Sequence, residues 1–287
     1  MDKIPIFIVN LKKDSERKKH MQQLCKQHSL DYQFIDAICG KDLDDNELKK
    51  IYDKKRTLSE LGRELSAGEI GCTLSHKEIY RTMIRKNIEQ AVIFEDDITF
   101  NHRIHDAIST IADFPDDWEC VLLHYHRNNP FAKFYCISPY NRITVGKNLK
   151  IVRFTDLMHS TGAYIINLAG ARKLLSALEQ GVYKPADHYT GDENEINLYG
   201  LHPRLVETDT MIHLQSEILI GRNIARRNAP GLAGKSKKTK SKMDIFRQLL
   251  KKIGLHELFR KINLKRAEIA YFLKNIKHCL IKPKKYT

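Results

Sequence analysis

Short apolar runs separated by longer amphipathic stretches set the pattern of the first two thirds of the chain. Residues 5–11 read PIFIVNL, and residues 91–94 read AVIF. Short continuous runs of this kind, rich in β-branched residues, are typical of strands buried on both faces of a parallel sheet. We expect further strands at 32–38, 120–125, 159–166 and within 199–220. The alternation predicts an α/β fold, a mostly parallel sheet flanked by helices.

Capping residues mark the starts of two helices. Asp14 is placed to cap a helix that runs toward His28. Residues 66–69 read SAGE, a capping box that opens a helix over 66–86, with an apolar stripe of Ile70, Leu74, Ile79 and Met83. We expect further helices at 42–61, 100–114 and 168–178, an irregular stretch at 128–150 and a loop at 182–192.

Basic charge is concentrated at the C-terminal end. The 287 residues carry a formal net charge of +14, yet residues 222–287 alone hold 20 Lys and Arg against 3 Asp and Glu. We therefore expect a nearly neutral α/β domain at 1–221, a basic flexible linker at 222–242 and a basic amphipathic helical region at 243–287. This last region has the pattern of a membrane-surface helix; a helix packed on the domain and a nucleic-acid arm are the alternatives.

Other features of the chain narrow its location and partners. Its six cysteines form no CxxC pair, which favours reduced thiols in a cytosolic protein. Residues 1–5 show no secretory signal, and no stretch approaches 18 uncharged apolar residues. No nucleic-acid recognition module is evident, so no nucleic-acid partner is expected. We expect a cytoplasmic protein, peripheral on the inner face of the cytoplasmic membrane.

Three acids, Glu95, Asp96 and Asp97, follow the AVIF run. Ligands of open α/β sheets bind beyond the carboxyl ends of the strands, where these acids would lie. Alternation along an extended chain predicts that Glu95 and Asp97 face one way and Asp96 the other. Two neighbouring carboxylates favour a hard divalent cation, Mg²⁺ or Mn²⁺. The alternative is a solvated acidic loop with helix-capping residues.

The end of the first strand and the start of the first helix offer groups for a nucleotide. Asn10, Lys12 and Arg17 lie there, and a strand end followed by a helix N-terminus is suited to anions. A solvated first turn is the alternative. The chain has no GxGxxG motif, which disfavours a dinucleotide fold of the NAD type.

Five separated motifs occur in one order: FIVNLKKDSERKKHM, SAGEIGCTLSHKEIY, AVIFEDD, HSTGAYIINLAGARKLL and KPADHYTGD. Together, over about residues 4–220, they resemble glycosyltransferase family 25, the lipooligosaccharide galactosyltransferase family. The resemblance implies a GT-A-like (Rossmann-like) fold in a catalytic domain, and a UDP-sugar donor, usually UDP-galactose. It also implies an Mn²⁺-type cofactor and inverting transfer, here to a lipid-linked oligosaccharide acceptor of the lipooligosaccharide or lipopolysaccharide core.

The resemblance also implies roles for single residues. Glu95, Asp96 and Asp97 match the family's EDD. Independently of the resemblance, a metal held by Asp97 and Glu95 would neutralise the charge that develops on the leaving diphosphate. His213 is a further candidate ligand for metal or phosphate, with a structural histidine as the alternative. The matches on the donor and strand side are Asn10, Arg17, Ser75, His76, Thr161 and Gly162.

An inverting displacement needs a base remote from these acids to take the acceptor's proton. Asp187, Asp192 and Glu193 are the available carboxylates, and Asp187 is preferred because it matches the acid after proline in the last motif. Competing functions are transfer of another sugar from UDP, or a basic protein that binds membrane or nucleic acid without activity.

Overall fold

The computed structural model describes residues 3–125, 137–138, 142–154, 158–192 and 195–209. The predicted linker at 222–242 and the predicted helical region at 243–287 lie outside the described residues, as does the domain boundary at residue 221.

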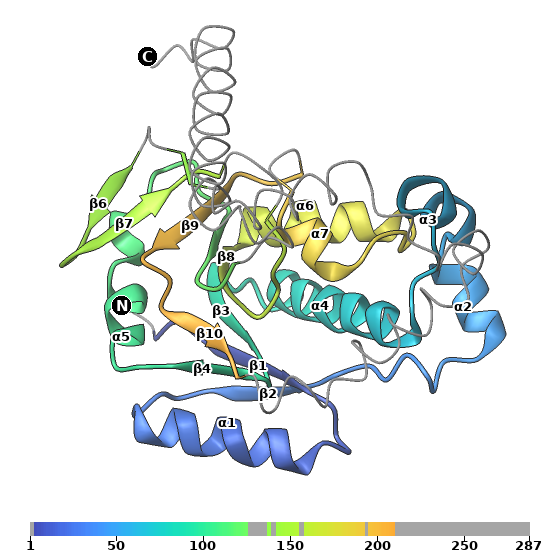
Figure 1. The fold of residues 1–287 in the computed structure, drawn as a ribbon, viewed down its shortest axis with the longest axis horizontal. Helices are drawn as coiled ribbons and strands as arrows, with labels where there is room; N and C mark the ends of the chain where they lie inside the picture. Colours follow the sequence, from blue (N-terminus) through green and yellow to red (C-terminus); the bar gives the residue numbers. More distant parts are fainter. Residues whose placement is uncertain (1–2, 126–136, 139–141, 155–157, 193–194, 210–287) are drawn as a thin grey trace, which may run out of the picture. The chain divides into compact units, whose positions relative to one another are not determined.

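An eight-stranded mixed sheet forms the centre of the fold (Figure 1). Its strands lie in the order β2 (Gln33–Asp36), β1 (Ile6–Asn10), β3 (Gln90–Glu95), β8 (Ala163–Asn167), β5 (Cys120–Leu122), β9 (Leu198–His202), β7 (Leu149–Val152) and β6 (Ile143–Val145). β8 and β7 run opposite to the other six strands of this sheet. The predicted α/β class, with a mostly parallel sheet flanked by helices, is confirmed.

Helices cover both faces of the sheet. α4 (Ala67–Arg85), α6 (Leu168–Glu179) and α7 (Ala186–Thr190) lie on one face, and α1 (Ser15–Gln27) lies on the other together with α5 (Ile104–Ser109) (Figure 1). Within β3, Ile93 packs toward α4 while Val92 and Phe94 pack toward α1, and all three are fully buried. A strand buried on both faces needs apolar residues at every position, which explains the unbroken AVIF run.

The caps that the sequence indicated are present. The Asp14 side chain accepts from the Arg17 amide at the start of α1, and Ser66 and Glu69 form the reciprocal capping box of α4. The helix expected at 42–61 is instead two, α2 (Asp45–Ile51) and α3 (Lys54–Leu61). Asp44 caps α2 and Asp53 caps α3, so Asp53 was the sequence signal that a second helix begins.

Three expected stretches differ from the structure. Residues 98–114 hold β4 (Ile98–Phe100), α5 and a 3₁₀ turn (Ile111–Asp113) rather than one helix. The hairpin of β6 and β7 occupies part of the stretch expected to be irregular; its turn uses Gly146 and Asn148 at positive φ. The loop expected at 182–192 contains α7.

A second, two-stranded sheet carries the chain back to the acids. β4 pairs with β10 (Val206–Thr208), and beyond β10 the Asp209 amide donates to the Asp97 carbonyl at 2.8 Å. The acidic turn is thus tied to a segment more than a hundred residues away. Among the described residues, no helix has the length and apolar character needed to cross a membrane.

Candidate functional site

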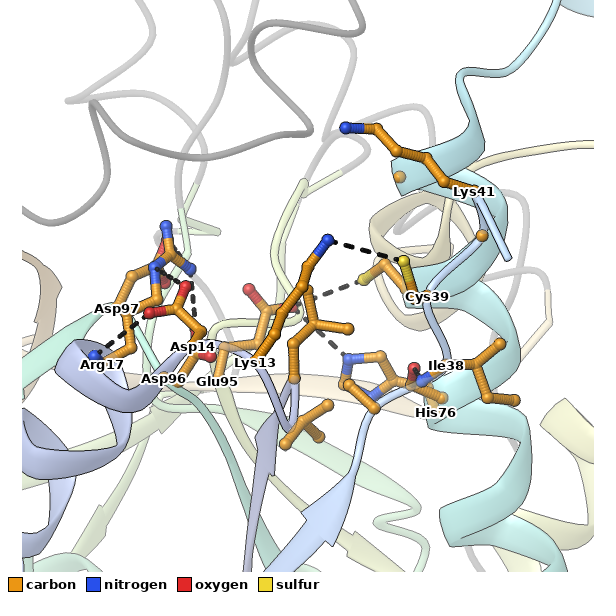
Figure 2. Close-up of a pocket in the computed structure, with 17 residues that line it drawn as sticks. Lys13, Asp14, Arg17, Ile38, Cys39, Lys41, His76, Glu95, Asp96 and Asp97 are labelled. Carbon is orange, nitrogen blue, oxygen red and sulfur yellow. Dashed lines mark hydrogen bonds and ion pairs between the residues drawn. The ribbon is translucent and has the colours of Figure 1, made fainter. Parts of the chain in front are cut away.

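A cavity opens at the carboxyl ends of β1 and β3, beside the first half of α4 (Figure 2). Lys13 and Arg17 line it from the start of α1, and Ser75 and His76 line it from α4. The segment 37–41 after β2 and the three acids after β3 complete the wall. The parallel pairing of β1 with β2 and β3 brings these separated segments to one edge of the sheet.

Arg17 joins two of the acids (Figure 2). Its Nη1 lies 2.7 Å from Asp96 Oδ1 and 3.8 Å from Asp97 Oδ2. Asn10 Nδ2 donates to the other Asp96 oxygen at 2.8 Å. Burial raises the pKa of Asp96 to about 6, against the opposing effects of Arg17 and Asn10. With both oxygens of Asp96 engaged by protein groups, this acid holds Arg17 and the strand end in place.

The expected alternation of the three acids is wrong. Asp96 and Asp97 both approach Arg17, whereas Glu95 turns to the side of α4. The reason is that β3 ends at Glu95 and the chain turns at the next two residues, so the period of two for an extended strand no longer applies.

Glu95 is oriented by side chains from two elements. Its Oε1 accepts a short hydrogen bond from the Thr161 hydroxyl and lies 3.4 Å from His76 Nε2 and 3.8 Å from Cys72 Sγ. An ionised carboxylate only accepts, so the hydrogen bond from His76 places its proton on Nε2. Thr161, just before β8, and His76, on α4, therefore together fix the orientation of this carboxylate.

A chain of buried hydroxyls continues behind His76. His76 Nδ1 lies 2.8 Å from the Tyr164 hydroxyl, which in turn lies 3.0 Å from the Tyr80 hydroxyl. With Nε2 protonated, Nδ1 accepts from Tyr164. Burial raises the pKa of Tyr164 and Tyr80 well above the usual tyrosine range, which keeps both hydroxyls protonated as donors. His76 thus positions Glu95, and its own ring is fixed from behind.

Ser75 holds the wall of the cavity. Its Oγ donates to the Gly71 carbonyl at 2.7 Å and accepts from the Ile38 amide at 2.8 Å. The segment 38–40 lies so close to α4 that a Cβ at Gly71 would meet the Ile38 carbonyl at 2.4 Å. Ser75 and the absence of a side chain at Gly71 together fix this segment against the helix.

Lys12 does not line the cavity. It is exposed and pairs with the exposed Asp36 at 3.1 Å, as the solvated alternative predicts. Its neighbour Lys13 lines the cavity instead, with Nζ 3.7 Å from Cys39 Sγ. Sequence reasoning missed Lys13, Cys39, Lys41 and Cys72. Only the four-residue spacing between Cys72 and His76 on a helix offered a signal, since residues one turn apart share a face.

The acids at the cavity fit a hard divalent cation. Glu95 and Asp97 offer carboxylate oxygens at the cavity wall. Counting the three acids and Arg17, the group has a formal charge of −2. Cys72, His76 and Glu95 also have ligand atoms within 4.8 Å of one another, a mixed set suited to softer ions. His213, the further expected ligand, lies outside the described residues.

The candidate base lies on a different segment from the cavity. Asp187 is in the first turn of α7, with Oδ2 3.8 Å from His159 Nδ1. Asp192 is held by Lys184 at 3.4 Å, and Glu193 lies outside the described residues. The two regions are linked through residues 158–162, since Thr161 bonds Glu95 and the Glu95 amide donates to the Gly162 carbonyl at 2.8 Å.

Known proteins resemble this chain over the region that holds the site. Procollagen galactosyltransferase 1-A of Xenopus laevis is 28% identical over 209 residues, 69% of this chain and 32% of that protein. Procollagen galactosyltransferase 2 of Homo sapiens is 28% identical over 193 residues, 64% of this chain and 29% of that protein. The "Probable inactive glycosyltransferase 25 family member 3" of Rattus norvegicus is 25% identical over 195 residues, 64% of this chain and 32% of that protein.

The chain spans about a third of the length of these curated relatives. Among solved structures, mouse xyloside xylosyltransferase 1 matches with a TM-score of 0.33 and 15% identity, over 70% of each chain. The family model for glycosyltransferase family 25 (LPS biosynthesis protein) matches residues 3–190, from β1 through α7. This match covers both the cavity and the segment of Asp187, and the chain therefore belongs to glycosyltransferase family 25.

Proposed function

We propose that this chain is an inverting, metal-dependent glycosyltransferase that moves galactose from UDP-galactose to a lipid-linked oligosaccharide acceptor of the lipooligosaccharide or lipopolysaccharide core. The observation that carries the proposal is the cavity in which Arg17 and Lys13 face three carboxylates at the ends of parallel strands. Membership of the family and the names of its procollagen galactosyltransferase relatives support the transfer of galactose.

The cavity provides separate surfaces for the diphosphate and the base of a nucleotide sugar. Lys13 and Lys41 bring positive charge to the wall on which a diphosphate would lie, and Leu11 and Ile38 bring apolar surface suited to a base. Glu95 and Asp97 would hold Mn²⁺ or Mg²⁺. When bound, this ion would neutralise the charge that develops on the leaving diphosphate. Arg17 and Asn10 keep Asp96 ionised and the acidic turn in position.

Inversion requires that a base remove the acceptor's proton on the face of the sugar opposite the diphosphate. We assign this role to Asp187. Its side chain is 16% exposed, which leaves it accessible, and its Oδ2 lies 3.8 Å from His159 Nδ1. Asp192 is less suited because its carboxylate is already paired with the ammonium group of Lys184 at 3.4 Å.

A donor screen tests the proposal directly. The purified full-length protein would be incubated with UDP-galactose, UDP-glucose and UDP-N-acetylglucosamine, each with Mn²⁺ or with a chelator, and release of UDP would be followed. We expect metal-dependent release that is fastest with UDP-galactose and is lost in Asp97→Asn. Lys12→Gln, which changes an exposed residue outside the cavity, should release UDP at the wild-type rate.

Each other outcome selects a competing function. Faster turnover of a different UDP-sugar would keep the enzyme and change its donor. Release that persists with chelator would remove the metal. No release with any donor would favour a binding protein, as for those relatives whose names call them inactive. We further propose that the basic C-terminal region holds the protein on the inner face of the cytoplasmic membrane, where a lipid-linked acceptor would be found.

A further inference from the structure

We propose that His159, Asp187 and His188 form a second cation site, specific for Zn²⁺-type ions and separate from the acids of the cavity. One ligand atom from each of the three lies within 4.8 Å of the other two. The rings of the two histidines are 4.5 Å apart between centroids, and His159 Nδ1 is 3.8 Å from Asp187 Oδ2. A tetrahedral ion about 2.1 Å from each ligand sets the ligand atoms ~3.4 Å apart, so small side-chain rotations complete the site.

The two backbone segments that carry these ligands are fixed to each other. The Met158 amide donates to the Gly191 carbonyl at 3.3 Å, and the Thr190 hydroxyl donates to the Ser160 carbonyl at 3.0 Å. A Cβ at Gly191 would meet the Met158 carbonyl oxygen at 1.5 Å, so the approach requires glycine. These contacts flank His159 on both sides and hold the chain directly after Asp187 and His188. The geometry therefore belongs to a rigid frame, which is what a preformed metal site needs.

The ligand chemistry and exposure select the class of ion. Two imidazoles and one carboxylate are the ligands of zinc sites that keep an open fourth position, whereas Mg²⁺ and Ca²⁺ prefer oxygen alone. The side chains of His159 and Asp187 are 15% and 16% exposed, so they are largely shielded yet reachable from solvent. The cavity acids offer mainly oxygen ligands, and the two sites would thus take different metals.

Occupation of this site has a consequence for catalysis that rests on the proposed function. An ion bound to Asp187 engages the carboxylate that the proposed mechanism uses as its base. The zinc-loaded protein would then be inhibited, and removal of zinc would restore transfer. Binding itself does not depend on this step and is measured without any substrate.

Cobalt spectroscopy provides the test, because Co²⁺ replaces Zn²⁺ and its visible absorption reports tetrahedral coordination. Full-length protein freed of metal would be titrated with Co²⁺ in excess Mg²⁺, which occupies oxygen sites. We expect visible bands without a thiolate charge-transfer band, and an affinity lowered by at least ~100-fold in His188→Gln, more than the ~10–100-fold that loss of an outer hydrogen-bond partner costs. Cys72→Ser, which alters the other cluster, and His105→Gln, an exposed histidine bonded to the His28 carbonyl, are the matched controls and should bind as wild type.

Several results would overturn the site. These are the absence of visible bands, bands that survive His159→Gln and His188→Gln, or bands that disappear in Cys72→Ser. If His188→Gln does not fold, the near-isosteric Asp187→Asn replaces it, and the melting temperature is measured against Zn²⁺ concentration. A site in the folded state raises the melting temperature of wild type as Zn²⁺ rises. An equal rise in Asp187→Asn would reject the site, and loss of the rise would support it.

Discussion

Arg17 lies 2.7 Å from Asp96 and 3.8 Å from Asp97, so one guanidinium group pairs with two consecutive buried acids. From the sequence alone, the acids called for a metal ion as their counter-charge. The structure adds a protein cation, Arg17, which lies in the first turn of α1 and 79 residues before Asp96. Part of the charge balance of the acidic turn is therefore built into the fold, and Glu95 is the acid set apart from it.

Arg17→Gln should impair both stability and donor use. Removing one partner of a largely buried ion pair costs on the order of 3 kcal/mol, because the other charge is left desolvated. We expect a lower melting temperature and a kcat/KM for UDP-galactose reduced by at least ~100-fold, about 2.7 kcal/mol of transition-state stabilisation. Lys12→Gln breaks an exposed pair in the same segment and should change stability by less than about 0.5 kcal/mol. Equal effects of the two variants would show that burial of the Arg17 pair has no special role.

His76→Gln tests whether Glu95 must be held in one orientation. The variant removes the ring that links Tyr164 to Glu95, while Glu95 keeps its own charge. We expect UDP release to require higher Mn²⁺ concentrations, with about 10–100-fold lower apparent metal affinity, the usual cost of losing an outer partner of a ligand. Tyr80→Phe removes only the far end of the chain of hydroxyls and should have a smaller effect. The measurement is UDP release against Mn²⁺ concentration; an unchanged curve in His76→Gln would exclude the positioning role.

The sequence was most informative where one local rule acts alone. Unbroken apolar runs located β1 and β3, and caps located the starts of α1 and α4, because burial on both faces and unpaired helix amides leave signals within a few residues. The rule failed at Asp97, because the end of β3 changes which side a residue faces. Local reasoning also failed at Lys12 and Lys13, because a shift of one residue along the chain changes which lysine faces the cavity. The pairing of Lys12 with Asp36 on β2 leaves Lys13 as the lysine at the cavity.

The candidate base and its surroundings lay beyond sequence reasoning. Asp187 was selected by its motif, but nothing along the chain places His159 next to it. That contact depends on the packing of α7 against the segment before β8, which is a tertiary arrangement between positions 28 residues apart. Cys72 near Glu95 arises in the same way, from the packing of α4 over the end of β3.

Asp187→Asn keeps the shape of the side chain but removes its basicity. If Asp187 is the base, kcat should fall by at least ~10²-fold with little change in the KM for the donor. The measurement is the steady-state rate with a soluble acceptor. The buffers are first freed of metal with a chelator, and Mn²⁺ alone is then added. Asp192→Asn is the matched control, since its carboxylate pairs with Lys184. An active Asp187→Asn together with an inactive Asp192→Asn would transfer the role to Asp192.

Stability should decrease on acidification through His202. Burial, and then Arg142 and Lys150, lower the pKa of His202 in the folded protein. The unfolded chain, with a histidine pKa near ~6.5, therefore binds this proton more readily than the folded one. The contribution of His202 to the free energy of unfolding should be at its maximum above pH ~6.5 and should decline as the pH falls below that value. Urea unfolding at several pH values should show a shallower decline in His202→Gln; parallel curves for the two proteins would contradict the assignment.

The basic region after residue 221 is expected to bind anionic membranes mainly through its charge. Each lysine close to an anionic surface contributes roughly 1 kcal/mol, so changing Lys235, Lys237, Lys238, Lys240 and Lys242 to glutamine should weaken binding to phosphatidylserine vesicles by at least ~100-fold. The matched control changes five exposed lysines of the α/β domain, Lys19, Lys26, Lys49, Lys50 and Lys55, with the same loss of net charge.

Position, rather than total charge, then decides the outcome of vesicle sedimentation. The control protein should sediment with vesicles nearly as wild type does. Added salt should release the control and the wild-type protein, because screening shortens the reach of the attraction to about 8 Å at physiological ionic strength. The variant changed at residues 235–242 should stay in solution and still turn over a short soluble acceptor, since these residues lie outside the cavity. Equal sedimentation of the two five-lysine variants would show that the attraction comes from net charge alone, and would remove the membrane role from this region.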